Sequence, residues 1–218
     1  MKAVLGFLRK LRKNNNKPWF DANRDAYTEA KQEVETFLEG LIASYGKSDD
    51  SISRLTPKEC MFRINRDVRF SKDKSPYKLN FGASINPGGK KSTLAGYYLH
   101  IEPGQSFVGG GLWMPMPAEL SKIRQEIDYN LDEFTTILKS PAFKKQFGVL
   151  YSGEDMSLQR VPKGYEAQNP AAEYLKLKSF IATRPLTDEE IVSKSLQKTC
   201  IAVFTALRPL LDFINRTQ

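Results

Sequence analysis

The stretch that decides the fold is Leu94-Ala-Gly-Tyr-Tyr-Leu-His-Ile101, then Glu102-Pro-Gly-Gln105, then Ser106-Phe-Val-Gly-Gly-Gly-Leu-Trp113. Aromatic and aliphatic residues of the outer pieces favour strands. The Pro-Gly pair between them stands where a type II turn requires it. The stretch therefore predicts a β-hairpin. Its three consecutive glycines are typical of a bulge, or of a place where another backbone or a ligand comes close.

Upstream of this hairpin, residues 58–70 alternate between apolar and polar side chains, which predicts a strand. Cys60, Ile64 and Val68 fall on its apolar face. A short strand is expected at residues 80–85, before the turn signal Asn-Pro-Gly-Gly at residues 86–89.

Helical periodicity flanks these strands on both sides. It predicts a helix over residues 3–13, a longer one that begins at Asp21 and ends near Tyr45, and further helices around residues 120–138. A capping box at Thr187 opens a C-terminal helix. Helices, consecutive strands and helices in this order predict an α+β fold, with a central antiparallel or mixed sheet and the N-terminal and C-terminal helices packed on it.

The chain has 218 residues, of which 40% are hydrophobic and 27% charged. This size and composition predict a single globular domain over residues 1–218. The formal net charge of +8 is typical of proteins that meet phosphates, nucleic acid or acidic partners.

The two cysteines, Cys60 and Cys200, are far apart and belong to no metal-binding pattern, so we expect buried thiols in a reducing compartment. No signal peptide or membrane-spanning run is apparent, which predicts a cytoplasmic protein without a membrane partner. We expect no cofactor and no metal, because the glycine run lacks the phosphate-loop pattern and no metal-ligand cluster stands near the lone histidine. The oligomeric state is left open.

The segment of residues 63–78, called the basic segment below, contains six Lys or Arg and two Asp. In strand register Arg66 points toward the apolar face, where its guanidinium needs a carboxylate, carbonyls or a bound anion. Arginine meets phosphate or carboxylate with two parallel hydrogen bonds. The predicted ligand contacts in this segment are Arg63, Arg66, Arg69, Lys72, Lys74, Tyr77 and Lys78. The alternative is a charged edge strand whose cations only discourage aggregation.

Two further groups complete the candidate site. Tyr98 and Trp113 of the hairpin are candidates for a surface on which bases stack. His100, the only histidine, and Asp67 are the candidates for a general acid or base.

Four stretches carry a resemblance to a known family. The first contains Asn14-Asn15, Trp19-Phe20 and Asn23-Arg24, and the second runs from Arg66 to Lys78. The third contains Gly96-Tyr97-Tyr98, His100-Ile101, Pro103-Gly104, Gly109-Gly110-Gly111 and Trp113. The fourth contains Pro162-Lys163-Gly164-Tyr165 and Lys178-Ser179-Phe180.

Together these stretches resemble the bacterial and fungal family of conserved hypothetical proteins known as domain of unknown function 2461. The resemblance implies one domain over most of the chain and no particular activity. The family tends to have an Asp-His-Pro-like sequence where this chain has Gln168-Asn169-Pro170. That departure weakens the case for an enzyme that depends on such a histidine.

Three functions remain open from the sequence. The first is binding of a phosphorylated or other anionic ligand, including nucleic acid, by the basic segment. The second is an enzyme that acts on a small phosphorylated or carboxylated substrate. The third is a module in which the basic segment docks an acidic protein partner.

Overall fold

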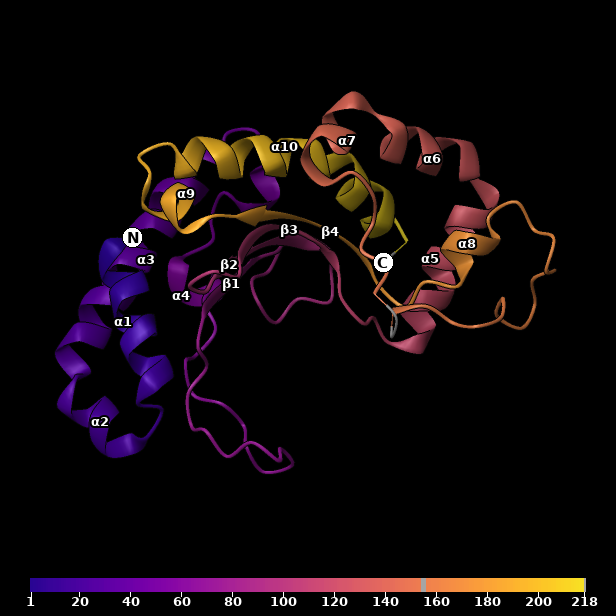
Figure 1. Cartoon of the computed structure of the whole chain (residues 1–218). Coiled ribbons are helices and arrows are strands. Elements are labelled where there is room, and N and C mark those ends of the chain that lie inside the picture. Colours follow the sequence, from indigo (N-terminus) through magenta and orange to yellow (C-terminus); the bar gives the residue numbers. More distant parts are fainter. Residues whose placement is uncertain (154–155, 218) are drawn as a thin grey trace. The chain divides into compact units, whose positions relative to one another are not determined.

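The computed structural model describes residues 1–153 and 156–217. Its described strands form one antiparallel sheet in the order β1-β2-β3-β4, with β1 at Phe81–Ile85, β2 at Gly96–Ile101, β3 at Ser106–Leu112 and β4 at Phe180–Leu186. Along the chain, helices precede β1, separate β3 from β4 and follow β4, as Figure 1 shows by colour. The α+β class predicted from the sequence is confirmed.

The chain divides into two compact units. The first comprises Met1–Ser92, Tyr98–Val108 and Pro185–Ile201, and the second comprises Thr93–Tyr97, Gly109–Arg184 and Ala202–Gln218. Strands β2, β3 and β4 contribute residues to both units. The prediction of a single domain over residues 1–218 stays a prediction.

The first unit begins with three helices, α1 at Lys2–Lys13, α2 at Lys17–Ala22 and α3 at Arg24–Tyr45, and α1 packs along α3 (Figure 1). The prediction that Asp21 begins one long helix is wrong. Asn16 caps α2 instead, because its side chain accepts a hydrogen bond from the Trp19 amide at 3.0 Å. Asp21 lies inside α2 and forms ion pairs with Lys17 and Arg24.

An aromatic cluster forms much of the core of this unit. Phe7 of α1, Phe20 of α2 and Tyr27 of α3 have ring centroids 5.0–6.1 Å apart. Tyr77 stacks on Phe20 at 4.0 Å, and Phe81 of β1 stacks on Tyr27 at 6.1 Å. The cluster therefore joins the helices to the segment that leads into β1.

The short elements η1, at Asp50–Ile52, and α4, at Pro57–Cys60, follow α3. The strand predicted over residues 58–70 is wrong, because a capping box between Thr56 and Glu59 draws residues 57–60 into helix. Beyond Cys60 the chain is extended but irregular, with isolated antiparallel bridges from Met61 to Ala83 and from Asn65 to Tyr77. The short strand predicted at residues 80–85 is confirmed as β1.

The predicted hairpin is confirmed by β2 and β3. The Gln105 amide donates a hydrogen bond to the Glu102 carbonyl at 2.9 Å, and Gly104 has a φ of 75°, as a type II turn requires. Leu99, Ile101 and Val108 are buried, whereas Tyr98, His100 and Phe107 are only half-buried. We call the surface formed by these last three residues the exposed face of the hairpin.

The second unit contains α5 at Pro117–Tyr129, α6 at Leu131–Lys139, α7 at Pro141–Phe147 and α8 at Ala172–Leu175. Ile123 of α5 and Phe134 of α6 are fully buried, and the helices predicted around residues 120–138 are confirmed. The glycine run of β3 lies here. A Cβ atom on Gly111 would overlap the Phe180 carbonyl oxygen of the neighbouring strand β4, which confirms the expected close approach of another backbone.

The C-terminal region forms two helices where one was predicted. Thr187 caps the short helix α9 at Asp188–Val192, and α10 at Leu196–Asn215 follows as a separate helix. Pro209 lies inside α10 without ending it. Within the second unit, Phe204 of α10 stacks on Tyr97 with centroids 4.3 Å apart.

Candidate functional site

The basic segment folds back on itself through main-chain hydrogen bonds, and Phe62, just before it, pairs with Gly82 of β1. The Phe62 amide donates to the Gly82 carbonyl at 3.0 Å, the Lys78 amide to Ile64 at 2.8 Å, and the Arg66 amide to Pro76 at 2.9 Å. Between these paired ends the chain extends away from the strands as a loop (Figure 1). The side chains of the loop are therefore carried on an irregular hairpin outside the four-stranded sheet.

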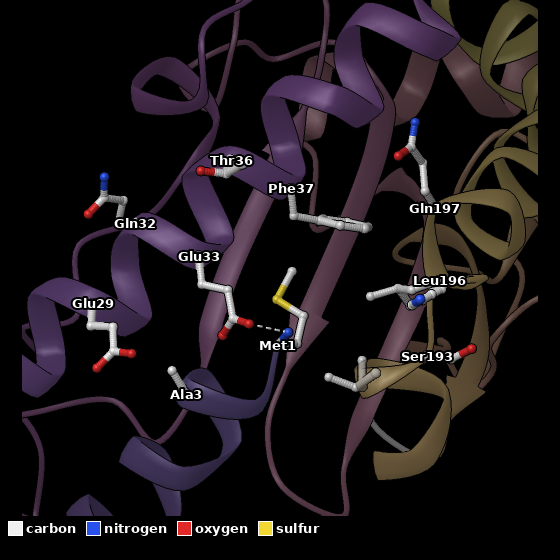
Figure 2. Close-up of a pocket in the computed structure, with 12 residues that line it drawn as sticks. Met1, Ala3, Glu29, Gln32, Glu33, Thr36, Phe37, Ser193, Leu196 and Gln197 are labelled. Carbon is white, nitrogen blue, oxygen red and sulfur yellow. Dashed lines mark ion pairs between the residues drawn. The ribbon is translucent and has the colours of Figure 1, made fainter.

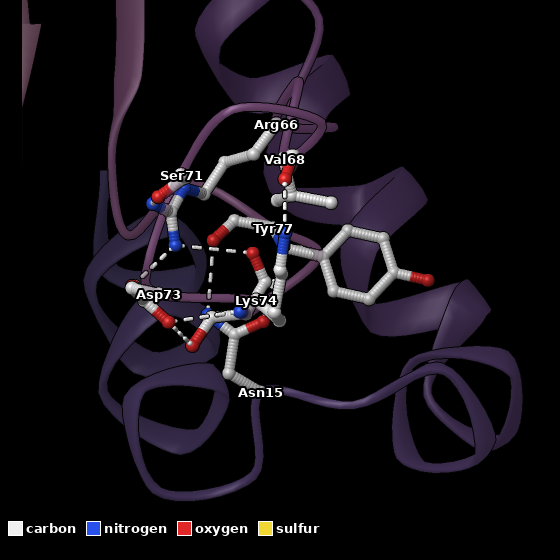
Figure 3. Close-up of polar contacts among 8 residues, drawn as sticks. Asn15, Arg66, Val68, Ser71, Asp73, Lys74 and Tyr77 are labelled. Atoms are coloured by element: carbon white, nitrogen blue, oxygen red, sulfur yellow. Dashed lines mark hydrogen bonds and ion pairs between the residues drawn. The ribbon is translucent and has the colours of Figure 1, made fainter.

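Arg66 holds this loop together from within (Figure 3). Its guanidinium forms an ion pair with Asp73 and donates to the Ser75 carbonyl at 3.1 Å and to the Ser71 hydroxyl at 3.3 Å. The expectation that Arg66 points toward the apolar face is wrong, because the predicted strand is absent and the side chain is half-exposed among polar partners. Arg66 is satisfied without a ligand.

Asp73 is the centre of the same network. The Ser75 hydroxyl donates to its carboxylate at 2.6 Å and the Ser75 amide at 2.9 Å. These two hydrogen bonds, together with the Arg66 guanidinium, lower the pKa of Asp73 to about 2. The carboxylate is therefore ionised at any neutral pH and keeps Arg66 in place.

Two more cations of the segment have partners inside the loop. Arg69 contacts both carboxylate oxygens of Asp67, at 3.0 and 2.7 Å, and its hydrogen bonds lower the pKa of Asp67. The Lys74 ammonium donates to the Val68 carbonyl at 3.0 Å. Phe70, between them, has 96% of its surface exposed.

Tyr77 anchors the end of the loop to the body of the first unit. The Asn15 side chain donates to the Tyr77 carbonyl at 2.9 Å and accepts from the Tyr77 amide at 3.1 Å (Figure 3). The Tyr77 ring is buried against Phe20. Its role in the structure is therefore to position the segment, and its ring is not presented to a ligand.

Three cations of the segment remain available: Arg63, Lys72 and Lys78. Within residues 1–153 and 156–217, no carboxylate forms an ion pair with any of them. Lys78 is half-buried, with its ammonium 5.5 Å from the centre of the Phe62 ring. Burial, and then the nearby positive charge of Arg63, lower the pKa of Lys78. Lys78 and Arg63 are thus two neighbouring like charges, neither in an ion pair with a described carboxylate, although the charge of Arg63 also helps to lower the pKa of Asp67.

The Phe62 ring connects this pair to the exposed face of the hairpin. Its centroid lies 6.5 Å from that of Tyr98, and 39% of Phe62 is exposed. Burial raises the pKa of the Tyr98 phenol, which is therefore neutral at physiological pH. Arg63, Lys78, Phe62 and Tyr98 together form the candidate site.

His100 lies beside Tyr98 in a chain of polar contacts. The Tyr98 hydroxyl is 3.4 Å from His100 Nδ1, and His100 Nε2 is 3.1 Å from Glu102 Oε2. Glu102 also accepts a hydrogen bond from Arg12 at 2.9 Å. The His100 ring stacks on Phe107 with centroids 4.7 Å apart.

The other predicted site residues lie elsewhere. Asp67 is paired with Arg69 in the loop, and no described contact joins it to His100. Trp113 follows β3 in the second unit, where 57% of it is exposed. In the part of the chain that the structure describes, no group of three or more His, Cys, Asp or Glu is placed to hold a metal ion.

Sequence reasoning missed Phe62, Glu102 and Arg12. Glu102 could have been found from the sequence. It stands two residues after His100, which stands two residues after Tyr98, and this spacing places Tyr98, His100 and Glu102 on one side of the hairpin. Arg12 gave no signal, because it lies 90 residues from Glu102 in the chain.

A cavity of about 590 Å³ in the first unit is lined by other residues. Figure 2 shows its lining by Glu29 and Glu33 of α3 and by Leu196 and Gln197 of α10, with the Met1 ammonium paired to Glu33. Its two carboxylates do not suit an anion. No helix among the described residues is both long and apolar enough to span a bilayer.

The fold and the site define an α+β protein in which the aromatic face of an antiparallel hairpin lies beside Phe62 and the cations of a basic segment. The family model of the conserved hypothetical proteins called DUF2461 matches residues 3–213, so the chain belongs to that family. The resemblance noted from the sequence is thereby confirmed. No curated protein and no solved structure matches the chain.

Proposed function

We propose that the protein binds a phosphorylated or otherwise anionic ligand through the basic segment, with Lys78 and Arg63 as the cations that contact it. The single observation that supports this is the half-buried Lys78 ammonium beside Arg63, with neither cation in an ion pair with a carboxylate of the described residues. Bringing two like charges together while one loses water costs free energy. An anion between them offsets that cost through charge-assisted hydrogen bonds.

The remaining groups of the site suit the same ligand. Phe62 and Tyr98 offer apolar ring surface beside the cations, on which a base or a sugar ring can lie. Lys72, farther out on the loop, adds a third unpaired charge for a longer ligand. Arg66 and Arg69 serve mainly to shape the loop, because Asp73 and Asp67 already neutralise them.

The test is a thermal-shift experiment with inorganic phosphate, nucleotides, sugar phosphates and short oligonucleotides, at low and moderate salt. A ligand at about 100 times its Kd adds about 2.7 kcal/mol to the free energy of unfolding. Lys78→Ala or Arg63→Ala should weaken binding about tenfold, since a hydrogen bond to a charged group contributes about 1.5–3 kcal/mol.

Lys47→Ala is the matched control, because Lys47 is an exposed lysine of the first unit with no described ion pair. Equal binding by the Lys78, Arg63 and Lys47 variants would contradict the proposal. A response only to oligonucleotides that falls steeply with salt would identify nucleic acid as the ligand.

One observation favours a second candidate, the docking of an acidic protein partner. Phe70 is almost fully exposed on a loop that its own hydrogen bonds hold in shape, and Arg69 lies 5.8 Å from its ring centre. Preorganised aromatic residues next to arginine are typical of interface hot spots. A ligand panel without any response would move the assignment to this candidate.

A further inference from the structure

We propose that Tyr98, His100 and Glu102 form a proton relay on the exposed face of the hairpin, and that the Tyr98 hydroxyl is the atom through which the relay meets a phosphate or carboxylate group. The inference rests on the proposed function, since the ligand is the anion held by Lys78 and Arg63. The inference adds a contact between the Tyr98 hydroxyl and the anion, a direction in which the phenol proton moves, and a dependence of binding on pH.

The hydrogen-bonding capacity of Glu102 fixes the tautomer of His100. An ionised carboxylate only accepts hydrogen bonds, so His100 Nε2, 3.1 Å from Glu102 Oε2, carries the proton. The lone pair of Nδ1 then faces the Tyr98 hydroxyl at 3.4 Å. Arg12 fixes Glu102 by donating to its other oxygen, and Phe107 fixes the imidazole plane by stacking.

Protonation of His100 reverses the hydrogen bond that it shares with Tyr98. While the imidazole is neutral, Tyr98 donates to Nδ1 and presents only lone pairs outward. Once Nδ1 is protonated it donates to Tyr98, and the phenol proton is free to point toward the ligand. Because an anion only accepts hydrogen bonds, the anion favours the second arrangement.

The protons balance in either of two ways. If the ligand arrives fully ionised, His100 takes one proton from solvent, and no bond of the ligand changes. If the ligand carries a hydroxyl proton, that proton passes to Tyr98 as the phenol proton passes to Nδ1. The ligand then gains one negative charge and the imidazole one positive charge.

The charged groups around His100 support this direction. Glu102, which follows β2, stabilises the imidazolium, and Arg12 of α1 donates to the other oxygen of Glu102 and to the Pro103 carbonyl. Phe107 of β3 adds no charge. The Lys78 ammonium lies 5.5 Å from the centre of the Phe62 ring, whose centroid lies 6.5 Å from that of Tyr98, and the proposal places the bound anion between the cations and the phenol.

Gly82 offers a way to disturb the relay without removing any of its groups. A Cβ atom at this position would lie 2.5 Å from the Tyr98 hydroxyl oxygen, so Gly82→Ala displaces the hydroxyl. Gly6→Ala is the matched control, because nothing lies within 4 Å of a Cβ atom there.

The test uses the fact that His100 is the only histidine, so a long-range ¹H–¹⁵N spectrum contains one imidazole. Without ligand, we expect the neutral imidazole to be the Nε2–H tautomer alone. Tyr98→Phe and Gly82→Ala should each shift the Nδ1 resonance, and Gly6→Ala should not. A substantial Nδ1–H tautomer in the unmodified protein would overturn the relay whatever the ligand does.

The second arm adds inorganic phosphate at constant pH and constant ionic strength. We expect the His100 resonances to move toward the protonated form, with a smaller movement in Tyr98→Phe and a need for about tenfold more phosphate in Lys78→Ala. Phosphate that stabilises the protein in the thermal-shift experiment but leaves His100 unmoved overturns the relay and leaves the proposed function standing. Absence of both responses, with the Nε2–H tautomer intact, overturns the proposed function and the Tyr98 contact together.

Discussion

At the scale of single residues, the polar side chains of the basic segment divide by whether a neighbour already satisfies them. Arg66 and Arg69 have carboxylate partners within the loop, whereas Lys78 and Arg63 have none among the described residues. The sequence shows six cations in one segment but not this division, because it depends on how the loop closes. Contacts between side chains three or four residues apart on a helix can be predicted from a sequence. The turn that brings Asp73 back to Arg66 cannot.

The pKa of Asp73 makes the network of the loop testable by acid. Folding lowers this pKa to about 2. The contacts of the carboxylate therefore contribute fully to the stability of the folded protein at pH values above the ordinary pKa of an aspartate. This contribution is lost as the pH falls through about 2. The Ser75 amide donates to this carboxylate at 2.9 Å, so its NMR resonance should follow the titration with a midpoint near 2.

The Asp73→Asn variant is the control for that titration, and its Ser75 resonance should not move over the same range. An unmodified protein whose Ser75 resonance moves with a midpoint near 4, the ordinary value for aspartate, would show that Arg66 and Ser75 do not hold the carboxylate in solution.

At the scale of elements, the predictable parts are those whose signal is local. The hairpin followed from its Pro-Gly turn and the helices of the second unit from their periodicity. Strand β4 was not predicted, because Arg184-Pro185 interrupts its pattern. The strand predicted at residues 58–70 is absent, because the first residues of the alternating stretch belong to helix α4, which the capping box begins.

The glycine run of β3 gives a prediction for the sheet. Gly111 has a φ of 120°, and a Cβ atom there would overlap the Phe180 carbonyl oxygen of β4. Gly111→Ala should lower the free energy of unfolding by about 2 kcal/mol or more, from backbone strain and overpacking. Urea denaturation followed by circular dichroism measures the change.

Gly6→Ala, inside α1, should instead raise the free energy of unfolding by up to about 1 kcal/mol, because alanine favours helix. If Gly111→Ala proved as stable as the unmodified protein, β3 and β4 would not approach each other as closely as they do here.

At the scale of the whole molecule, three strands supply residues to both compact units. A unit that contains only parts of strands should not unfold while the rest of those strands stays paired, so we expect one cooperative transition. The chain has two tryptophans, Trp19 in the first unit and Trp113 in the second. Their fluorescence, read separately in Trp113→Phe and Trp19→Phe, should report the same urea midpoint.

Two separated midpoints would instead show that the units unfold independently, against the prediction of a single domain. Calorimetry of the unmodified protein is the control for effects of the substitutions, since a two-state transition has equal calorimetric and van't Hoff enthalpies.

At this scale, the contacts between distant residues that form the candidate site could not be predicted from the sequence. The candidate site depends on Phe62 lying beside Tyr98, and its relay on Arg12 reaching Glu102. Each of these side chains is ordinary in its own stretch of sequence. Only the closure of the aromatic cluster and the pairing beside β1 brings them together, and neither leaves a periodic signal.

The two hydrogen bonds between the Asn15 side chain and the Tyr77 main chain have a consequence for synthesis of the protein on the ribosome. Asn15 and Tyr77 are 62 residues apart, so the amide side chain leaves the ribosome well before the main chain that it will hold. At a synthesis rate of about 5–20 residues per second, the N-terminal helices wait about 3–12 s for Tyr77. During that interval the Phe20 ring lacks its stacking partner. A nascent chain halted in that window therefore presents an apolar surface to chaperones that the finished protein conceals.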